Sequence, residues 1–173
     1  MGQKEELIKL IGQTEYTALE SQIPDKIKQD IVVNFSDYLL GKTEQQILDF
    51  YSELINSNNQ WTLPKITGSI VILTSHINDL LVKLVETREK DIKIKETAKN
   101  FDLHYLILFC TARYNIPKDH FIQLMELKHF RNMVAHDFNS IMETSFNQAI
   151  HPIAKAHLLI IVLTQMIKEV KNG

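Results

Sequence analysis

Helical periodicity over nearly the whole chain is the feature that most restricts its fold. Apolar residues recur at intervals of three and four positions, and no segment shows the convincing apolar–polar alternation of a half-buried strand. The sequence therefore predicts an all-α fold, a helical bundle of about five to seven helices with short connections. Helices are expected at about residues 3–20, 24–40, 43–55, 66–90, 97–114, 118–137 and from about 152 onward.

The length and composition suit one folded domain. The chain has 173 residues, of which 45% are hydrophobic and 23% charged, as in ordinary folded proteins. The polar stretch Asn56–Lys65 is the clearest linker. We therefore expect a single all-helical domain over residues 1–173, with an N-terminal helical extension over about 1–60 and a core over about 61–173. Residues 86–99, dense in both signs of charge, are expected to form a solvated helix end and turn.

Charge and hydropathy indicate a cytoplasmic protein without membrane contact. The formal net charge is −2, so any contact with nucleic acid has to be local. The N-terminus has no long apolar run after its first charges, and Glu6 stands where a myristoylation signal needs Ser or Thr. The apolar run His157–Ile167 is shorter than the ~20 residues that span a bilayer.

Most familiar catalytic patterns are missing, and we expect neither a metal nor a cofactor. The single cysteine, Cys110, lies in the apolar run LILFC, which indicates a buried, inert thiol. One Glu-x-x-His pair exists, Glu126 with His129, but a di-metal bundle site needs a second copy that the sequence lacks. His76 and His104 lie on mostly apolar helices, which favours core or boundary positions over metal ligands.

The stretch Glu126–Phe138, ELKHFRNMVAHDF, is the one that points to chemistry. It places Arg131 directly before Asn132 and five positions before His136, in a chain with only three arginines. For this composition, such a combination is expected by chance roughly 0.01 times per chain. This stretch is therefore the candidate site.

The residue types suit the cleavage of RNA by its own 2′-hydroxyl. That reaction needs a base of near-neutral pKa, for which His136 is the natural candidate. It also needs positive charge at the phosphate, which the planar guanidinium of Arg131 offers. Asn132 can hydrogen-bond the phosphate or orient His136, one helical turn further on. No metal is required for this chemistry.

The run Arg131-Asn132-Met133-Val134-Ala135-His136 resembles the R-x4-6-H motif of the HEPN superfamily, whose members are all-helical. The resemblance implies a metal-independent endoribonuclease that uses Arg131 and His136, and Asn132 supplies the polar residue that the family prefers after the arginine. We add Glu126 and His129, which lie in the same stretch, as supporting residues. The resemblance also implies a homodimer that cleaves RNA, which we take to be single-stranded, in a toxin, antiphage defence or RNA-processing role. An antitoxin or other regulatory protein is a further expected partner. The setting is compatible over about residues 60–173, and the first sixty residues are not explained by it.

Helix geometry adds a constraint on this site. At about 100° per residue, Arg131 and His136 are some 140° apart around a straight helix, on either side of an apolar stripe of Leu127, Phe130 and Val134. One helix therefore presents both side chains poorly to one phosphate. Either a helix end near His136 or a partner chain related by a two-fold axis would solve the problem.

Other interpretations of the same residues stay open. Arg131 could be a surface ion-pair residue, and His136 a favourable cation near a helix carboxyl end. Glu126 projects toward the apolar stripe and needs a partner if buried, with Arg131 or Arg113 as candidates. The toxin branch that is paired with nucleotidyltransferase antitoxins carries a modifiable tyrosine two positions after the histidine, where this chain has Phe138. Phenylalanine has no phenolic oxygen to accept a nucleotide, so this departure speaks against membership of that particular two-component system.

Two alternatives to a nuclease follow from these observations. The first is a HEPN-like module that binds RNA, a nucleotide or a protein without cleaving anything. The second is an unrelated helical interaction protein.

Overall fold

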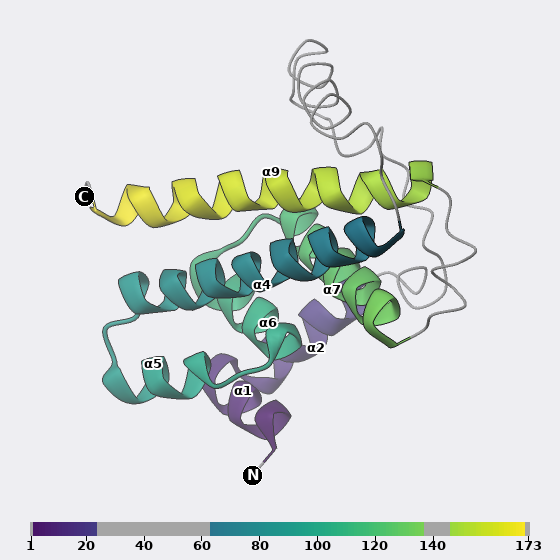
Figure 1. The fold of residues 1–173 in the computed structure, drawn as a ribbon. Helices are drawn as coiled ribbons and strands as arrows, with labels where there is room; N and C mark the ends of the chain where they lie inside the picture. The colour runs from purple at the N-terminus through teal and green to yellow at the C-terminus, as the bar shows by residue number, and fades with distance from the viewer. Residues whose placement is uncertain (1, 24–62, 137–145, 172–173) are drawn as a thin grey trace.

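All regular structure in the described part of the chain is α-helical, which confirms the predicted fold class. The computed structural model describes residues 2–23, 63–136 and 146–171. Seven helices lie within these ranges (Figure 1). The helices expected at 24–40 and 43–55, and most of the expected linker, lie outside the described residues. The described helices are α1 Gln3–Ile11, α2 Gln13–Gln22, α4 Leu63–Arg88, α5 Ile92–Lys99, α6 Leu103–Tyr114, α7 Lys118–His136 and α9 Phe146–Lys171.

The two longest helices, α4 and α9, have 26 residues each and run side by side in the same direction (Figure 1). Their facing sides carry apolar residues at helical spacing, as an amphipathic stripe requires. Removing these side chains from water is the main driving force for their association. The buried apolar residues described on the two helices are Ile70, Ile77, Leu81, Leu84 and Val85 on α4, and Ile153, Ala154, Ala156, Leu159, Leu163 and Ile167 on α9.

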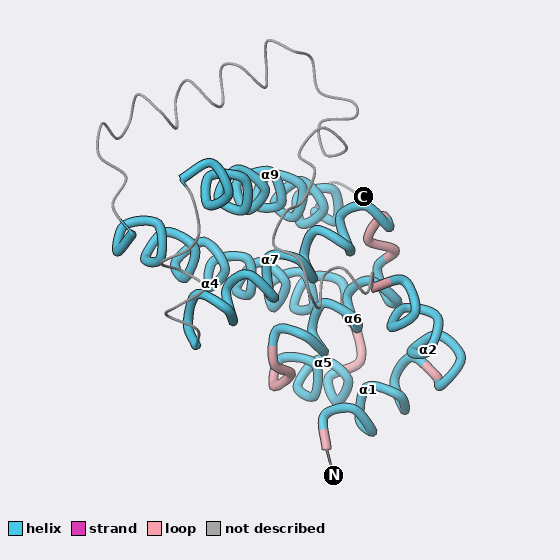
Figure 2. The backbone as a smooth tube through the Cα atoms, turned by 90° about the vertical axis from the view of Figure 1, so that its right-hand side faces the viewer, coloured by secondary structure: helices cyan, strands magenta, loops and turns pink. Residues whose placement is uncertain are grey.

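Helix α6 lies against α4 on one side and α1 on the other, and it is buried along most of its length. In both views, α1, α2 and α5 lie on the side of the bundle away from α9 (Figure 2). Phe109 is fully buried and makes edge-on ring contacts with Phe101 and Tyr114. Cys110 is fully buried as well, and this burial raises the pKa of its thiol. The prediction that Cys110 is a buried core residue is therefore confirmed.

The N-terminal segment expected as one helix over 3–20 is two helices, so that prediction was wrong. Gly12 separates α1 from α2 with φ at +89°, a conformation that is readily available only to glycine. Its N–H donates to the carbonyl of Ile8 at 2.8 Å and closes α1. Helical periodicity continues across Gly12, so the pattern concealed the break.

Asp91 and Asp102 cap two separate helices, α5 and α6, whose bounds differ from those expected from the sequence. Residues 92–99, expected within a solvated turn and the start of a helix over 97–114, form the separate helix α5. The Asp91 carboxylate accepts hydrogen bonds from the N–H groups of Lys93 and Ile94 and caps α5. The Asp102 carboxylate accepts from the N–H of Tyr105 and caps α6. Both are ordinary N-cap positions.

Helix α9 begins six residues earlier than expected, at Phe146, so that Pro152 lies inside it rather than at its start. Proline has no N–H and is most common in a first turn, which is why the sequence placed the start there. Beyond the proline, Ile153, Ala154 and Ala156 of α9 are buried.

The segment Gly68–Arg88 of α4 is long and apolar enough to cross a membrane by length and composition. The same segment packs against α9, α6 and α7 within the described bundle. This arrangement is compatible with the core helix of a soluble protein, since such helices pass the same length and composition test.

A polar cluster fastens α2 to α6. The carboxylate of Glu20 accepts hydrogen bonds from the Tyr16 hydroxyl at 3.1 Å and from His104 Nε2 at 2.9 Å. Burial is the main reason that the pKa of Tyr16 is raised to about 12, so its hydroxyl stays a donor. Burial, followed by the nearby charge of Lys128, lowers the pKa of His104, although Glu20 and Asp102 oppose the shift. His104 is thus a boundary histidine, as its sequence position indicated.

We predict that this cluster makes stability depend on pH. Because the pKa of folded His104 is lower than in the unfolded chain, its contribution to the free energy of unfolding is present above about pH 6.5 and is lost as the pH falls. For one proton the slope is at most about 1.4 kcal/mol per pH unit. Urea denaturation between pH 7.5 and 5 measures it.

Two variants separate His104 from the other titrating groups. His104→Asn should flatten the dependence on pH because it removes the titrating ring. Glu20→Gln should steepen it, because the carboxylate that favours the protonated imidazole is gone. If the free energy of unfolding changed equally with pH in both variants and in the parent, this assignment would be wrong.

Candidate functional site

Helix α7 carries every residue of the predicted site and is anchored by its apolar face. Leu124, Leu127 and Phe130 are buried, and the helix packs against α4, α6 and α9. The predicted stripe is therefore confirmed at Leu127 and Phe130. The side chain of Val134, its third member, lies outside the described part. Burial of this face fixes which side of α7 the neighbouring polar residues occupy.

Arg131 lies on the exposed side of α7, next to the buried Phe130. Its Nη1 donates a hydrogen bond to Oδ1 of Asn132 at 3.0 Å. Arg131 is exposed and Asn132 is half-buried. The hydrogen bond to the amide oxygen of Asn132 therefore restrains a guanidinium that is otherwise open to solvent. The remaining guanidinium donors are in a position to meet an anionic ligand.

His136 is the last residue of α7. Its side chain lies outside the described part of the structure, as does Phe138. The predicted 140° separation between Arg131 and His136 therefore stays a prediction from helix geometry. Position 136 follows position 129 by seven residues, about two turns, so both positions fall on one side of α7.

His129 is half-buried on α7, and its pKa is lowered by burial and by the adjacent Lys128. A lowered pKa keeps the imidazole mainly neutral near pH 7. A neutral imidazole can accept or relay a proton. His129 thus has a suitable chemical state for the supporting role that the sequence analysis gave it.

Glu126 pairs with a residue that the sequence analysis did not consider. Its Oε2 accepts from Nζ of Lys155 on α9 at 2.8 Å. The side chains are 3% exposed for Lys155 and 14% for Glu126. Neither arginine considered from the sequence takes this place, because Arg113 pairs with Glu89 and Arg131 with Asn132.

The Lys155–Glu126 pair is a buried ion pair that joins α7 to α9. Burial lowers the pKa of Lys155, while the charge and hydrogen bond of Glu126 oppose that shift. A lysine in the largely apolar run from Ile153 to Leu163 is a signal that could have revealed the need for a carboxylate partner. Glu126 therefore has a structural task, besides any supporting role at the site.

No group of three or more His, Cys, Asp or Glu side chains that could hold a metal ion occurs among the described residues. The single Glu-x-x-His pair, Glu126 with His129, has its carboxylate engaged by Lys155. The candidate site is therefore a cationic and imidazole-bearing end of α7 rather than a cluster of carboxylates.

No family model, curated protein or solved structure matches this chain. The chemical groups that α7 carries are therefore the basis for a function.

We predict that Glu126 is needed for folding through Lys155. Glu126→Leu removes the carboxylate that accepts from the buried ammonium of Lys155 and should lower the free energy of unfolding by about 3 kcal/mol. Lys155→Met should cost less, since the carboxylate of Glu126 retains some access to water. The double variant should recover most of the loss, because an apolar pair of similar size replaces the ion pair.

Urea denaturation of the four proteins gives the coupling energy of the pair. Glu15→Leu, at an exposed position on α2, is the control and should change stability by no more than about 0.5 kcal/mol. If the losses of the two single variants simply added in the double variant, the pair would not be coupled.

Proposed function

We propose that this protein is a metal-independent endoribonuclease of the HEPN type that acts as a homodimer. The observation that carries the proposal is the run from Arg131 to His136 at the end of α7, with Arg131 exposed and held by Asn132. A cytoplasmic role in a toxin, antiphage defence or RNA-processing system belongs to the same proposal.

In the proposed reaction, His136 takes the proton from a ribose 2′-hydroxyl of RNA. The 2′-oxygen attacks the adjacent phosphorus, and the bond from phosphorus to the 5′-oxygen of the next nucleotide breaks. The leaving oxygen takes up a proton, so the products carry a 2′,3′-cyclic phosphate and a 5′-hydroxyl. Arg131 stabilises the charge that builds up on the phosphate oxygens.

The support from α7 is electrostatic as well as geometric. Asn132 restrains the guanidinium of Arg131, which lowers the entropy lost when it binds a phosphate. His129, whose pKa is lowered, offers a second neutral imidazole on the same side of α7 as position 136. It is a candidate to relay the proton between His136 and the leaving oxygen.

A dimer follows from the separation of Arg131 and His136 around one helix. Two α7 helices that meet across a two-fold axis would bring the arginine of each chain to the histidine of the other. Each site then combines Arg131 of one chain with the histidine of the other chain, which a single helix cannot present on one face.

We predict that the purified protein cleaves single-stranded RNA in the presence of EDTA. His136→Ala and Arg131→Ala should each lower the cleavage rate by about 10²-fold or more. Binding should separate their roles, since Arg131→Ala weakens RNA affinity most visibly at low salt and His136→Ala keeps most of it. End-group analysis of the products checks the cyclic phosphate.

Two control variants separate chemistry from folding. His76→Ala removes an exposed imidazole on α4 and should cleave at the parent rate. Phe130→Ala removes a buried ring and should cost roughly 3–5 kcal/mol of stability, whereas Arg131→Ala should cost little. Strict dependence on magnesium or manganese would contradict the mechanism, and normal folding with no cleavage of any RNA would select the non-catalytic binding module.

We also predict a homodimer at micromolar concentration, measured by sedimentation velocity. Mixing Arg131→Ala with His136→Ala should then restore part of the activity, because a mixed dimer keeps one intact composite site. A monomer in sedimentation, or mixed variants without any recovery, would rule out the shared site.

A further inference from the structure

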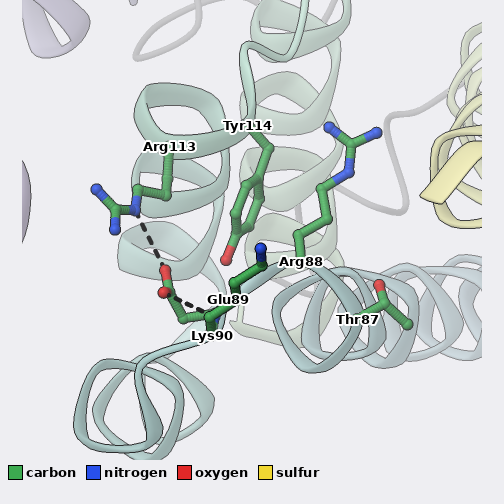
Figure 3. A pocket seen from close by; sticks show the side chains of 6 residues that line it. All are labelled: Thr87, Arg88, Glu89, Lys90, Arg113 and Tyr114. Atoms are coloured by element: carbon green, nitrogen blue, oxygen red, sulfur yellow. Dashed lines mark hydrogen bonds and ion pairs between the residues drawn. The ribbon is translucent and has the colours of Figure 1, made fainter. Parts of the chain in front are cut away.

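A pocket of about 530 Å3 lies where the end of α4 meets the end of α6 (Figure 3). This volume falls within the ~300–1,000 Å3 typical of small-molecule sites. The pocket is separate from the α7 motif. In Figure 1 the C-terminal ends of α4 and α7 lie at opposite sides of the molecule. The lining residues are Thr87, Arg88, Glu89, Lys90, Arg113 and Tyr114.

The pocket concentrates positive charge in a chain whose net charge is −2. Arg88 and Arg113 are two of the three arginines in the sequence, and Lys90 adds a third cation. The carboxylate of Glu89 offsets one of these charges, so the lining carries a formal charge of about +2. Cations gathered around a concave surface attract anions.

Glu89 is a fixed part of the wall rather than a competitor for a ligand. Its Oε1 accepts from the N–H groups of Lys90 and Asp91, and its Oε2 accepts from Nε of Arg113 at 3.2 Å. Burial alone would raise its pKa, but these hydrogen bonds and the charge of Arg113 outweigh burial and lower it. Glu89 is therefore ionised. It holds Arg113 through Nε alone, so neither terminal nitrogen of the Arg113 guanidinium takes part in this contact.

Tyr114 supplies the observation that points to a ligand. Its side chain is buried, and its hydroxyl has no hydrogen-bond partner among the described residues. In Figure 3 its ring lies between the side chains of Arg113 and Arg88, and its hydroxyl points toward the segment of Glu89 and Lys90. Burial raises the pKa of Tyr114, so the group is a neutral donor. A buried donor without an acceptor is costly.

Arg88 has a second unsatisfied donor in the same wall. Its Nη2 donates to the backbone carbonyl of Met166 on α9 at 3.0 Å, which holds the side chain in place. Its Nε is buried and has no partner among the described residues. A buried donor without an acceptor is costly, and this wall carries two such donors, Arg88 Nε and the Tyr114 hydroxyl.

We propose that this pocket binds the phosphate monoester group of a small phosphorylated metabolite. Such a group carries close to two negative charges at pH 7 and several acceptor oxygens. The charge matches the lining, and the oxygens match the donors of Arg113, Lys90 and Tyr114. The remaining volume accommodates the organic part of the molecule, which makes inorganic phosphate alone a poorer fit.

Calorimetric titration of the full chain with ribose 5-phosphate tests the proposal. Ribose 5-phosphate should bind, ribose should not, and inorganic phosphate should bind more weakly. Tyr114→Phe keeps the ring and removes only the hydroxyl, so it should lower the affinity by about tenfold or more, the scale of a hydrogen bond to a charged group. Lys90→Gln should also weaken binding, and its exposed side chain makes misfolding of this variant no concern.

Lys4→Gln, which removes a cation from α1 outside the pocket, is the matched control and should bind as the parent does. Thermal unfolding gives a second readout. Tyr114→Phe should be at least as stable as the parent without ligand, because no hydrogen bond is lost, and ribose 5-phosphate should stabilise it less than the parent. RNA with a 5′-hydroxyl should not displace ribose 5-phosphate.

Three results would overturn the proposal: no binding of ribose 5-phosphate at millimolar concentration, equal affinity in Tyr114→Phe and the parent, or displacement by RNA that has no terminal phosphate. The outcome is independent of the proposed nuclease. Tyr114→Phe should leave RNA cleavage unchanged, and Arg131→Ala should leave binding of ribose 5-phosphate unchanged.

Discussion

The packing of α4 against α9 is the interaction on which the remaining structure depends. Each helix has 26 residues, and in proteins most of the stability of such a helix comes from packing of its apolar face. With this pair in place, α6 and α7 have a surface to pack on. Two polar contacts accompany this packing. Arg88 of α4 donates to the backbone carbonyl of Met166 on α9, and Lys155 of α9 donates to Glu126 of α7.

Much of this fold could be read from the sequence, because burial of apolar faces leaves a strong pattern. The expected helix 118–137 agrees with α7 to within one residue, and that of 66–90 agrees with α4 to within three. The errors arose where local backbone chemistry overrides periodicity. Gly12 adopts a positive φ inside an apolar pattern, and Asp91 and Asp102 cap separate helices in a stretch dominated by charge. Residues 24–62 and 137–145 lie outside the comparison.

The candidate site could be predicted only in part, for a different reason. The motif is local in sequence, so the exposed place of Arg131 followed from the stripe of Leu127 and Phe130. The partner of Glu126 lies 29 residues further along the chain, and periodicity does not encode which helices meet. The pocket is assembled in the same way, from the ends of α4 and α6. Its charge is invisible in a sequence whose acidic and basic residues nearly balance.

Pro152 gives α9 a built-in discontinuity. Because proline has no N–H, the carbonyl of residue 148 lacks the donor that every other turn of the helix receives four residues on. The segment before the proline is thus joined to the remainder by a weakened hydrogen-bond ladder, while Ile153 and Ala154 just beyond it are buried. We therefore expect local opening of α9 to divide at this break, with the backbone amides before Pro152 exchanging faster than those beyond it.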